Sequence, residues 1–247
     1  MGSSYEHICV ALDVDNPGDA ITFVNKIREF PIWVKVGITL WNMRGGGYGL
    51  VEQLLSINPN LKIFLDLKLN DIPFQMQGAL RALEGLGVKY VSIHGGSGAR
   101  HIHECVPVAN ELGIGLLAIT VLTSISEKEN KQSGAKQGVK QTVIKRAKFS
   151  ARAGAAGIVS SALEVHELQF LKEEYPNLKL VTPAVRPWPS DDDQRRSMHP
   201  VDAIRAGSDM LVIGRPIRNP PESIGSPISA LHAIAAMVNP YVTDVMM

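Results

Sequence analysis

The sequence predicts an α/β protein of the (β/α)8, or TIM, barrel class. Short apolar runs alternate with longer segments in which apolar residues recur at helical spacing, an alternation typical of a parallel sheet. Eight such strand–helix units follow one another within 247 residues, the usual size of this barrel. No linker, repeat or low-complexity segment divides the chain. We therefore expect a single barrel domain over residues 1–247.

The apolar runs define the predicted strands. The first two, HICVAL and WVKVG, are rich in β-branched and aromatic residues, and the other six have a similar composition. The predicted strands are 7–12, 33–37, 61–67, 90–94, 114–122, 157–161, 178–183 and 209–214.

A helix is predicted after each strand. For the first helix, Asn16 is a suitable N-cap and Pro17 suits the first turn, while Ile21, Val24 and Ile27 recur at helical spacing. A long polar loop precedes the fifth helix. The predicted helices are 17–30, 49–57, 73–86, 99–112, 139–153, 163–173, 200–206 and 227–238.

An open, doubly wound α/β sheet is the main alternative to a barrel. Such a sheet normally carries a glycine-rich phosphate-binding turn after its first strand. Here that turn reads LDVDNPGD and carries carboxylates instead. The barrel is therefore the preferred prediction.

Charge and composition argue against several classes of protein. The formal net charge is +1, so no overall field favours nucleic acid or an acidic membrane surface. No apolar stretch approaches the roughly 18 residues of a membrane span, and no signal-peptide pattern is present. Two cysteines, Cys9 and Cys105, are too few for a disulfide framework. We expect a soluble, cytoplasmic protein.

Polar and charged residues stand at the ends of the predicted strands. In this barrel class, active-site residues occupy the carboxyl ends of strands and the loops that follow them. Burying several charges is costly unless they pair, so their gathering there favours a functional site. The residues at these positions are Asp13, Lys35, Asp66, Lys68, Asp71, His94, Thr123, Arg186 and Arg215.

The third strand and its loop, KIFLDLKLNDIP, carry the densest charge. Side chains alternate between the faces of a strand, so Phe64, Asp66 and Lys68 should share one face. The leucines between them should face the surrounding helices. Asp66 and Lys68 would then point into the mouth of the barrel, with Asp71 beyond them. A structural ion pair at the rim is the alternative interpretation.

The segment after the eighth strand, IGRPI, suggests a phosphate site. Backbone N–H groups beside Gly214, together with the Arg215 guanidinium, suit a phosphate dianion, and this position often holds phosphate in such barrels. A capping glycine before a solvated arginine is the alternative. The long loop TPAVRPWPSDDDQRRSMHP could be a lid that closes over an anionic ligand with Gln194 or Arg195, or simply a solvated loop.

Seven motifs occur together in one order: ALDV, VKVG, FLDLKLNDIP, AITVLTS, VTPAVRP, DQRR and AGSDMLVIGRPI. With these motifs the chain, over about residues 7 to 235, resembles the orotidine 5′-phosphate decarboxylase family. The resemblance implies conversion of orotidine 5′-phosphate to uridine 5′-phosphate in de novo pyrimidine biosynthesis, with no cofactor and no metal.

The resemblance also implies roles for particular residues. Lys68 would stabilise the carbanion at pyrimidine C6 and then protonate it, while Asp66 would hold Lys68 near the substrate carboxylate. Lys35 would join this charge array, and Asp71 and Ile72 would come from the partner subunit of a homodimer with shared active sites. The implied substrate-binding residues are Asp13, Lys35, Asp66, Asp71, Ile72, Gln75, Thr123, Arg186, Gln194, Gly214 and Arg215.

Several positions depart from the family pattern, including the order Gly95-Gly96-Ser97-Gly98 after His94, where small residues are usual in another order. Gln75 replaces a usual threonine, Thr39 a usual glutamate and Ala184 a usual glycine. Ala184 would be strained only if its backbone requires a positive φ. The lysine–aspartate array is intact, which favours an active enzyme.

Two other functions remain open on the sequence alone. A magnesium-dependent keto-sugar-phosphate decarboxylase or aldolase of the same superfamily would share the D-x-K-x-x-D motif, but typically carries glutamate at the position of Lys35. A non-catalytic nucleotide-binding barrel would bind uridine phosphate without turnover. Sensitivity to a chelator distinguishes the first of these, and a turnover assay distinguishes the second.

Overall fold

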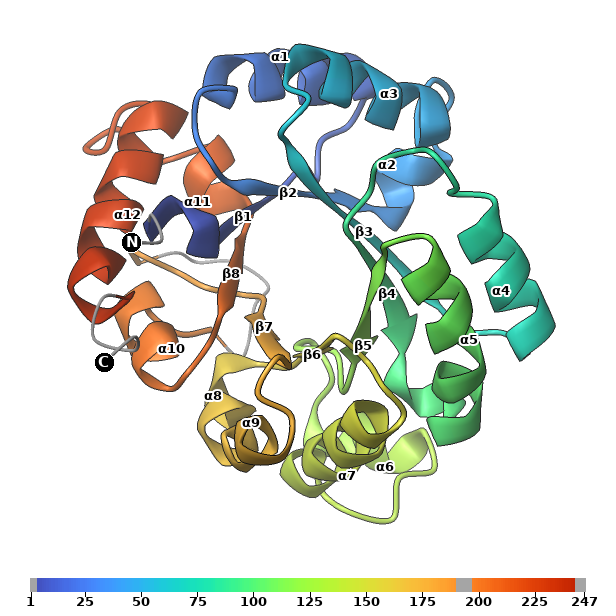
Figure 1. Cartoon of the computed structure of the whole chain (residues 1–247). Coiled ribbons are helices and arrows are strands. Elements are labelled where there is room, and N and C mark those ends of the chain that lie inside the picture. Colours follow the sequence, from blue (N-terminus) through green and yellow to red (C-terminus); the bar gives the residue numbers. More distant parts are fainter. Residues whose placement is uncertain (1–3, 190–196, 243–247) are drawn as a thin grey trace.

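The computed structural model describes residues 4–189 and 197–242, and within them eight parallel strands close into a barrel (Figure 1). Each strand pairs with its neighbours in the sequence, and β8 pairs with β1. The predicted TIM barrel is confirmed, and the open-sheet alternative is wrong. The strands are β1 (Ile8–Ala11), β2 (Trp33–Gly37), β3 (Lys62–Leu69), β4 (Tyr90–His94), β5 (Gly115–Ile119), β6 (Gly157–Val159), β7 (Lys179–Thr182) and β8 (Met210–Ile213).

Helices surround the barrel as an outer ring (Figure 1). They are α1 (Pro17–Ile27), α2 (Ile38–Asn42), α3 (Gly47–Ile57), α4 (Pro73–Arg81), α5 (Ala99–Glu111), α6 (Glu127–Gln132), α7 (Val139–Arg152), α8 (Ala162–Val165), α9 (Phe170–Glu174), α10 (Pro200–Arg205), α11 (Arg215–Arg218) and α12 (Pro227–Val242). In the described part of the chain, three short 3-10 helices accompany them: η1 (Ser4–His7), η2 (Gly95–Ser97) and η3 (His166–Leu168).

Some helices agree with the prediction and others differ from it. Asn16 caps α1 as expected, its Oδ1 accepting from the Asp19 N–H at 2.8 Å. The segment predicted as a polar loop contains α6, which begins at a capping box formed by Ser126 and Glu129. The helix predicted over 163–173 is divided into α8, η3 and α9.

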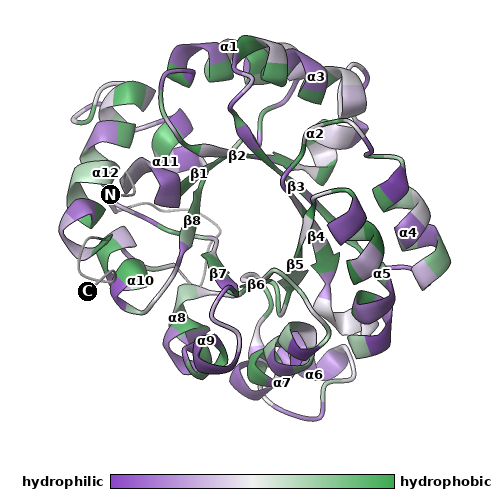
Figure 2. Cartoon of the chain, in the orientation of Figure 1, coloured by the Kyte–Doolittle hydropathy of each residue, from purple (hydrophilic) through white to green (hydrophobic). Residues whose placement is uncertain are grey.

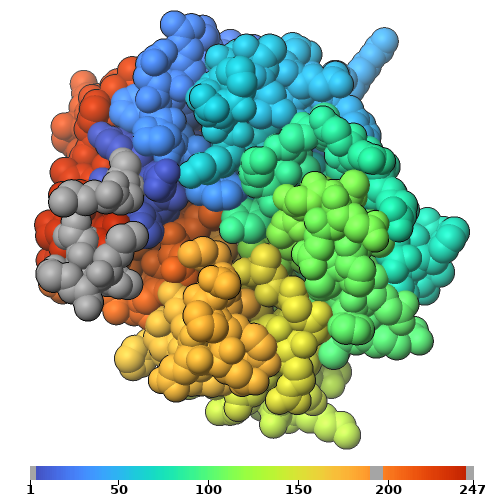
Figure 3. All heavy atoms as spheres, in the orientation of Figure 1, coloured from blue at the N-terminus to red at the C-terminus, as the bar shows by residue number. Residues whose placement is uncertain are grey.

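The hydrophobic core has two layers. The larger layer lies between the strands and the helices, and a smaller cluster fills the barrel interior. In Figure 2 the strands are mostly hydrophobic, whereas the ring helices also carry hydrophilic residues. The space-filling view shows that atoms fill the ring that looks open in the ribbon drawing (Figure 3). The interior residues are Cys9, Ala11, Phe64, Leu117, Ile119, Val159, Val181, Met210 and Val212.

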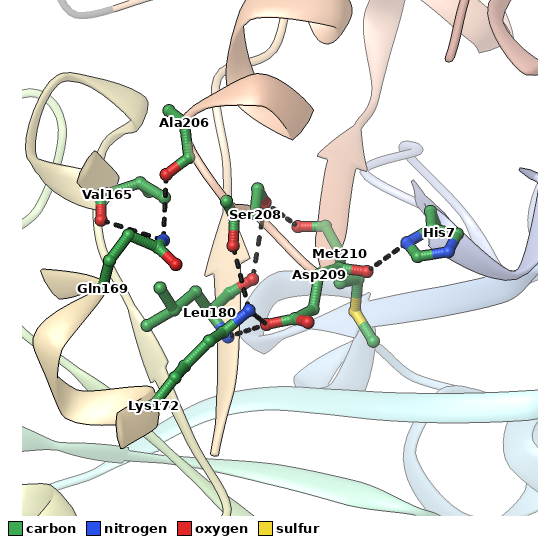
Figure 4. A network of polar contacts seen from close by, with 10 residues as sticks. His7, Val165, Gln169, Lys172, Leu180, Ala206, Ser208, Asp209 and Met210 are labelled. Carbon is green, nitrogen blue, oxygen red and sulfur yellow. Dashed lines mark hydrogen bonds and ion pairs between the residues drawn. The ribbon is translucent and has the colours of Figure 1, made fainter. Parts of the chain in front are cut away.

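A polar network ties β7 to β8 at the amino ends of these strands (Figure 4). Asp209 precedes β8, and its Oδ2 accepts both from Lys172 Nζ at 2.8 Å and from the Leu180 N–H at 2.7 Å. The Asp209 carbonyl accepts from His7 Nδ1 at 2.9 Å. Ser208 donates its hydroxyl toward the Leu180 and Met210 carbonyls. We call His7, Lys172, Leu180, Ser208, Asp209 and Met210 the amino-end network.

None of the helices in the described ranges combines the length and the apolar character needed to cross a membrane.

Candidate active site

A cavity of about 350 Å³ opens at the carboxyl ends of the strands, a size within the range of small-molecule sites. Its wall comes from segments far apart in the sequence, from β1 to the loop after β8. The cavity brings together eight of the residues that the sequence singles out: Asp13, Lys35, Asp66, Lys68, Thr123, Arg186, Gly214 and Arg215.

Four charged side chains in this cavity contact one another in series, and we call them the mouth array: Asp13, Lys35, Asp66 and Lys68. Lys68 Nζ donates to Asp66 Oδ2 at 2.7 Å, and Lys35 Nζ lies 3.6 Å from the same oxygen. Lys35 Nζ also donates to Asp13 Oδ1 at 3.0 Å. The charges therefore alternate in sign along the array, and the Asp66 carboxylate lies between two cations, Lys35 and Lys68.

The middle of the array is buried and its ends are more open. The side chains of Lys35 and Asp66 are 10% and 13% exposed, whereas Lys68 is 33% and Asp13 56% exposed. Burial alone would raise the pKa of Asp66, but Lys35, Lys68 and hydrogen bonds outweigh it, so this pKa is lowered. Burial would lower the pKa of Lys35, but Asp13 and Asp66 outweigh it, so this pKa is raised. Both groups keep their charge at neutral pH.

The glycine of the VKVG motif gives the array room. A Cβ on Gly37 would lie 3.2 Å from Asp13 Oδ1 and 3.3 Å from Lys35 Nζ. Both distances are tighter than ordinary side-chain contacts, so a larger residue would press on the ion pair.

Strand β3 is irregular where it carries Asp66 and Lys68. Leu65 pairs with Val91 and Leu69 with Ile93, so three residues of β3 face one residue of β4. Lys68 takes a left-handed backbone with φ of 51°. Regular strand pairing does not hold through this bulge, but the expected faces are confirmed: Phe64, Asp66 and Lys68 line the cavity. The leucines between them pack with the outer core layer.

Ser92 is a site residue that sequence reasoning missed. It is fully buried in β4, donates to Asp66 Oδ1 at 2.8 Å and accepts from the Lys68 backbone N–H at 2.8 Å. The only signal available was its position. Ser92 is the one small polar residue of the strand YVSIH, which the barrel order places beside the strand of Asp66.

An apolar surface lies beside the charges. The inner ends of several strands contribute Phe64, Ile119, Val159 and Val212 to both the barrel interior and the cavity wall. Water is poorly accommodated against such a surface, so charges in this cavity interact more strongly than in bulk solvent.

The proposed phosphate side of the cavity contains Arg186, Gly214 and Arg215. The backbone N–H of Arg186 donates to the Met198 carbonyl at 2.9 Å, which fixes the start of the loop after β7. Ala184 lies in this loop with φ of 61°, so the condition for strain at this position is met. Gln194 and Arg195 lie outside the described residues.

Asp71, Ile72 and Gln75 are not part of the wall that the described residues form around this cavity. Asp71 follows β3 and accepts from the Ile72 N–H at 2.7 Å. Ile72 and Gln75 are exposed at the start of α4, and Thr39 is exposed on α2. A single chain therefore assembles the mouth array without the second aspartate of the D-x-K-x-x-D motif.

The surroundings of two other titratable residues, Cys9 and His94, indicate structural roles. Burial raises the pKa of the Cys9 thiol, in keeping with a core filler. His94 Nδ1 accepts from the Gly96 N–H at 3.0 Å, and burial, Arg146 and Lys68 lower the pKa of His94. Within residues 4–189 and 197–242, no group of three or more His, Cys, Asp or Glu side chains is placed to hold a metal ion.

Comparison with known proteins gives a consistent result. Residues 6–224 match the model of the "Orotidine 5'-phosphate decarboxylase / HUMPS family". The chain is 39% identical over 217 residues to the orotidine 5′-phosphate decarboxylase of Vibrio parahaemolyticus, covering 86% of this chain and 90% of that protein.

A second relative and a solved structure extend this likeness. The orotidine 5′-phosphate decarboxylase of Haemophilus influenzae (strain PittEE) is 39% identical over 226 residues, which cover 89% of this chain and 96% of that protein. The crystal structure of the Lactobacillus acidophilus orotidine 5′-phosphate decarboxylase superposes with a TM-score of 0.78 at 30% identity, covering 95% of this chain and 99% of that one.

Proposed function

Because this chain belongs to the orotidine 5′-phosphate decarboxylase / HUMPS family, we propose that it decarboxylates orotidine 5′-phosphate to uridine 5′-phosphate, with Lys68 as the catalytic cation and acid. The reaction serves pyrimidine biosynthesis. The proposal includes a single barrel domain over residues 1–247 and a cytoplasmic location, both of which are expectations from the sequence.

The observation that carries this proposal is the Lys35–Asp66–Lys68 part of the mouth array. Loss of CO2 leaves an electron pair on C6 of the pyrimidine, and a nearby ammonium lowers the energy of that carbanion. Two unit charges about 4 Å apart interact by about 4 kcal/mol at an effective dielectric constant near 20. Lys68 Nζ, fixed by Asp66 Oδ2 at 2.7 Å, is oriented before the substrate arrives.

Asp66 has a second role in this mechanism. Its buried carboxylate would lie near the carboxylate of the substrate, and two like charges disfavour each other in the bound ground state. Departure of CO2 relieves this repulsion as charge moves to C6, where Lys68 transfers a proton. The bond from C6 to the carboxylate carbon breaks, its electron pair stays on C6, and the new C6–H bond forms with the Lys68 proton.

The remaining cavity residues would bind and orient the nucleotide. Gly214 and Arg215 would hold the phosphate with backbone N–H groups and a guanidinium, with Arg186 nearby. Asp13 and Lys35 would contact ribose hydroxyls, and Thr123 the pyrimidine. Binding energy from the phosphate, remote from C6, would then help to hold the substrate in the crowded site.

One contact favours this reaction over a magnesium-dependent reaction of a keto-sugar phosphate. Lys35 Nζ lies 3.0 Å from Asp13 and 3.6 Å from Asp66, between the two carboxylates that a divalent cation would otherwise need. An ammonium at that point competes with a metal ion for the same oxygens.

Absorbance spectroscopy tests the proposal directly. Orotidine 5′-phosphate should lose its characteristic ultraviolet absorbance on addition of the protein, equally with and without excess EDTA, and Lys68→Ala should be inactive. Activity that EDTA abolishes and Mg²⁺ restores would instead support the magnesium-dependent alternative. Tight uridine 5′-phosphate binding without turnover would support the non-catalytic barrel.

We further propose that the active enzyme is a homodimer in which Asp71 and Ile72 complete the partner's site. Ile38, Ile72 and Phe74 are 51%, 57% and 76% exposed. They follow the adjacent strands β2 and β3, so three apolar side chains are exposed on one side of the cavity mouth. Exposed apolar residues gathered in this way are typical of an interface, and two-fold symmetry would bring each Asp71 toward the other chain.

Mixed dimers distinguish a shared site from a self-contained one. Lys68→Ala and Asp71→Ala homodimers should each be nearly inactive. Refolded together, they should recover roughly a quarter of wild-type activity, because about half the dimers are mixed and each mixed dimer has one intact site. If wild type survives refolding but the mixture stays as inactive as its parents, Asp71 acts within its own chain.

A further inference from the structure

The bulge in β3 centres on one residue of the neighbouring strand. Between the pairs Leu65–Val91 and Leu69–Ile93, Ser92 is the one β4 residue opposite three residues of β3. A bulge disrupts the regular ladder of backbone hydrogen bonds. The N–H of Lys68 finds its acceptor in the Ser92 side chain, at 2.8 Å. A side chain thus supplies the link that regular strand pairing does not.

The directions of the Ser92 hydrogen bonds follow from the chemistry of the groups. The Lys68 N–H can only donate, and the ionised Asp66 carboxylate can only accept. Ser92 has one hydroxyl proton, which it therefore gives to Asp66 Oδ1 at 2.8 Å while its oxygen accepts from Lys68. With no exposed surface, Ser92 has no room to exchange these partners for bulk water.

These contacts give the two carboxylate oxygens of Asp66 different partners. Oδ1 is held by Ser92, and Oδ2 faces Lys68 Nζ at 2.7 Å and Lys35 Nζ at 3.6 Å. The same hydroxyl therefore fixes the rotation of the carboxylate and the left-handed backbone from which the Lys68 side chain extends. Ser92 therefore holds Lys68 in two ways: directly at its backbone N–H, and through Asp66 at its ammonium group.

We propose that Ser92 is a positioning residue for decarboxylation, which sets the rotation of Asp66 and the backbone of Lys68. This inference rests on the proposed function, in which Lys68 stabilises and protonates the C6 carbanion. Ser92 need not contact the nucleotide for this role. Its hydroxyl also stabilises the charged form of Asp66, in agreement with the lowered pKa of that group.

Removal of the hydroxyl should affect turnover more than binding. For Ser92→Ala we expect kcat to fall by about 10- to 100-fold, since small misplacements of catalytic groups have effects of this order. The affinity for uridine 5′-phosphate should stay within about threefold, because the phosphate contacts are on the other side of the cavity. The acid limb of the kcat–pH profile should move to higher pH, because Asp66 loses a hydrogen bond that favours its ionised form.

Ser208→Ala provides the matched control. Ser208 is also a buried serine whose hydroxyl contacts two partners, the carbonyls of Leu180 and Met210, but it lies at the amino ends of the strands. This variant should lose stability to a degree similar to Ser92→Ala, with kcat and its pH profile unchanged. A matched pair of variants, Ser92→Thr and Ser92→Val, separates hydroxyl from shape if the alanine variant folds poorly. The threonine variant should keep most of its turnover, and the valine variant should not.

The outcomes separate this inference from the proposed function. If Ser92→Ala retains wild-type kcat, or raises KM alone, while Lys68→Ala is inactive, Ser92 does not position the array and the inference is wrong. The same holds if Ser208→Ala lowers kcat equally, or if the threonine and valine variants turn over at the same rate. If Lys68→Ala itself remains active, the proposed function fails first.

Discussion

Lysine–aspartate pairs stand at both ends of this barrel, and they differ in what else they contact. At the amino ends of the strands, Lys172 and Asp209 are 2.8 Å apart, and Asp209 also binds the backbone of Leu180 (Figure 4). At the mouth, Lys68 and Asp66 are 2.7 Å apart, but their further partners are the side chains of Lys35 and Ser92. The first pair fixes helix α9 to the start of β8, whereas the second presents charge to a cavity. The pair distance alone does not distinguish a structural ion pair from a catalytic one.

The largest expected effect comes from removing the lysine of each pair. Lys68→Ala should lower kcat by more than about 10⁴-fold, since one residue supplies both a cation and an acid. Its affinity for uridine 5′-phosphate should stay within about tenfold. Lys172→Ala should retain wild-type turnover and lose about 1–2 kcal/mol of unfolding free energy. Steady-state kinetics and urea unfolding of both variants provide the measurement, and a loss of turnover in Lys172→Ala would remove the distinction between the two ends.

A second comparison concerns two arginines. Arg215→Ala should weaken binding of substrate and product by about 2–4 kcal/mol, because charge-assisted contacts to phosphate are strong. The control is Arg205→Ala, an arginine on α10 that donates to the Tyr241 hydroxyl at 2.9 Å and does not line the cavity. Titration calorimetry with uridine 5′-phosphate measures both. Equal affinities in the two variants would show that the phosphate is held elsewhere.

The pH dependence of stability sharpens the picture of the mouth array. Burial raises the pKa of Asp66, but Lys35 and Lys68 outweigh burial and lower it, so Asp66 stabilises the fold above the ordinary carboxyl pKa of about 3.9. That stabilisation is lost as the pH falls through the lower, folded-state pKa. Urea unfolding should therefore show a constant difference between wild type and Asp66→Asn from about pH 5 to 7, which shrinks below about pH 4. A difference that grows on acidification would contradict the assignment.

The smallest expected effect is that of Ala184→Gly at the mouth. Relief of the left-handed backbone is worth about 1–2 kcal/mol, but glycine costs about 0.5–1 kcal/mol of backbone entropy, and the lost methyl group about 0.8 kcal/mol of burial. The unfolding free energy should stay within about 1 kcal/mol of wild type. Ala184→Val should destabilise the protein much more, because a branched side chain at φ of 61° is strongly strained. Equal stabilities of the glycine and valine variants would mean that this loop rearranges.

Periodicity and strand-end chemistry predicted the barrel and the charged residues of the cavity wall, because both depend on local alternation. Lys35, Asp66 and Arg215 could be placed in this way. The bulge at Lys68 could not, since a register shift depends on how β3 meets β4 and leaves no mark in the alternation. Helix α6 was missed for a different reason. Its capping-box residues, Ser126 and Glu129, can be recognised in the sequence, but the helix is polar and lacks an apolar stripe.

Other parts of the site depend on information beyond one chain's local pattern. Ser92 resembles any small strand residue until its neighbour Asp66 is known to carry a charge in the same layer. Asp71, Ile72 and Gln75 lie outside the cavity wall of the described chain, and their placement stays a prediction from the resemblance to the family. The expected closure by Gln194 likewise stays a prediction.

The irregular pairing of β3 with β4 has a consequence for how this segment can vary in evolution. Most loops accept insertions and deletions more readily than strands do, because their length is not tied to a register. Between Leu65 and Leu69, one deleted residue would shorten the bulge and turn the following side chains to the opposite face of the strand. Lys68 would then face the helices and a leucine would face the substrate. Homologous genes should therefore conserve the number of codons in this stretch, even where the leucines between the charged residues are replaced by other apolar residues.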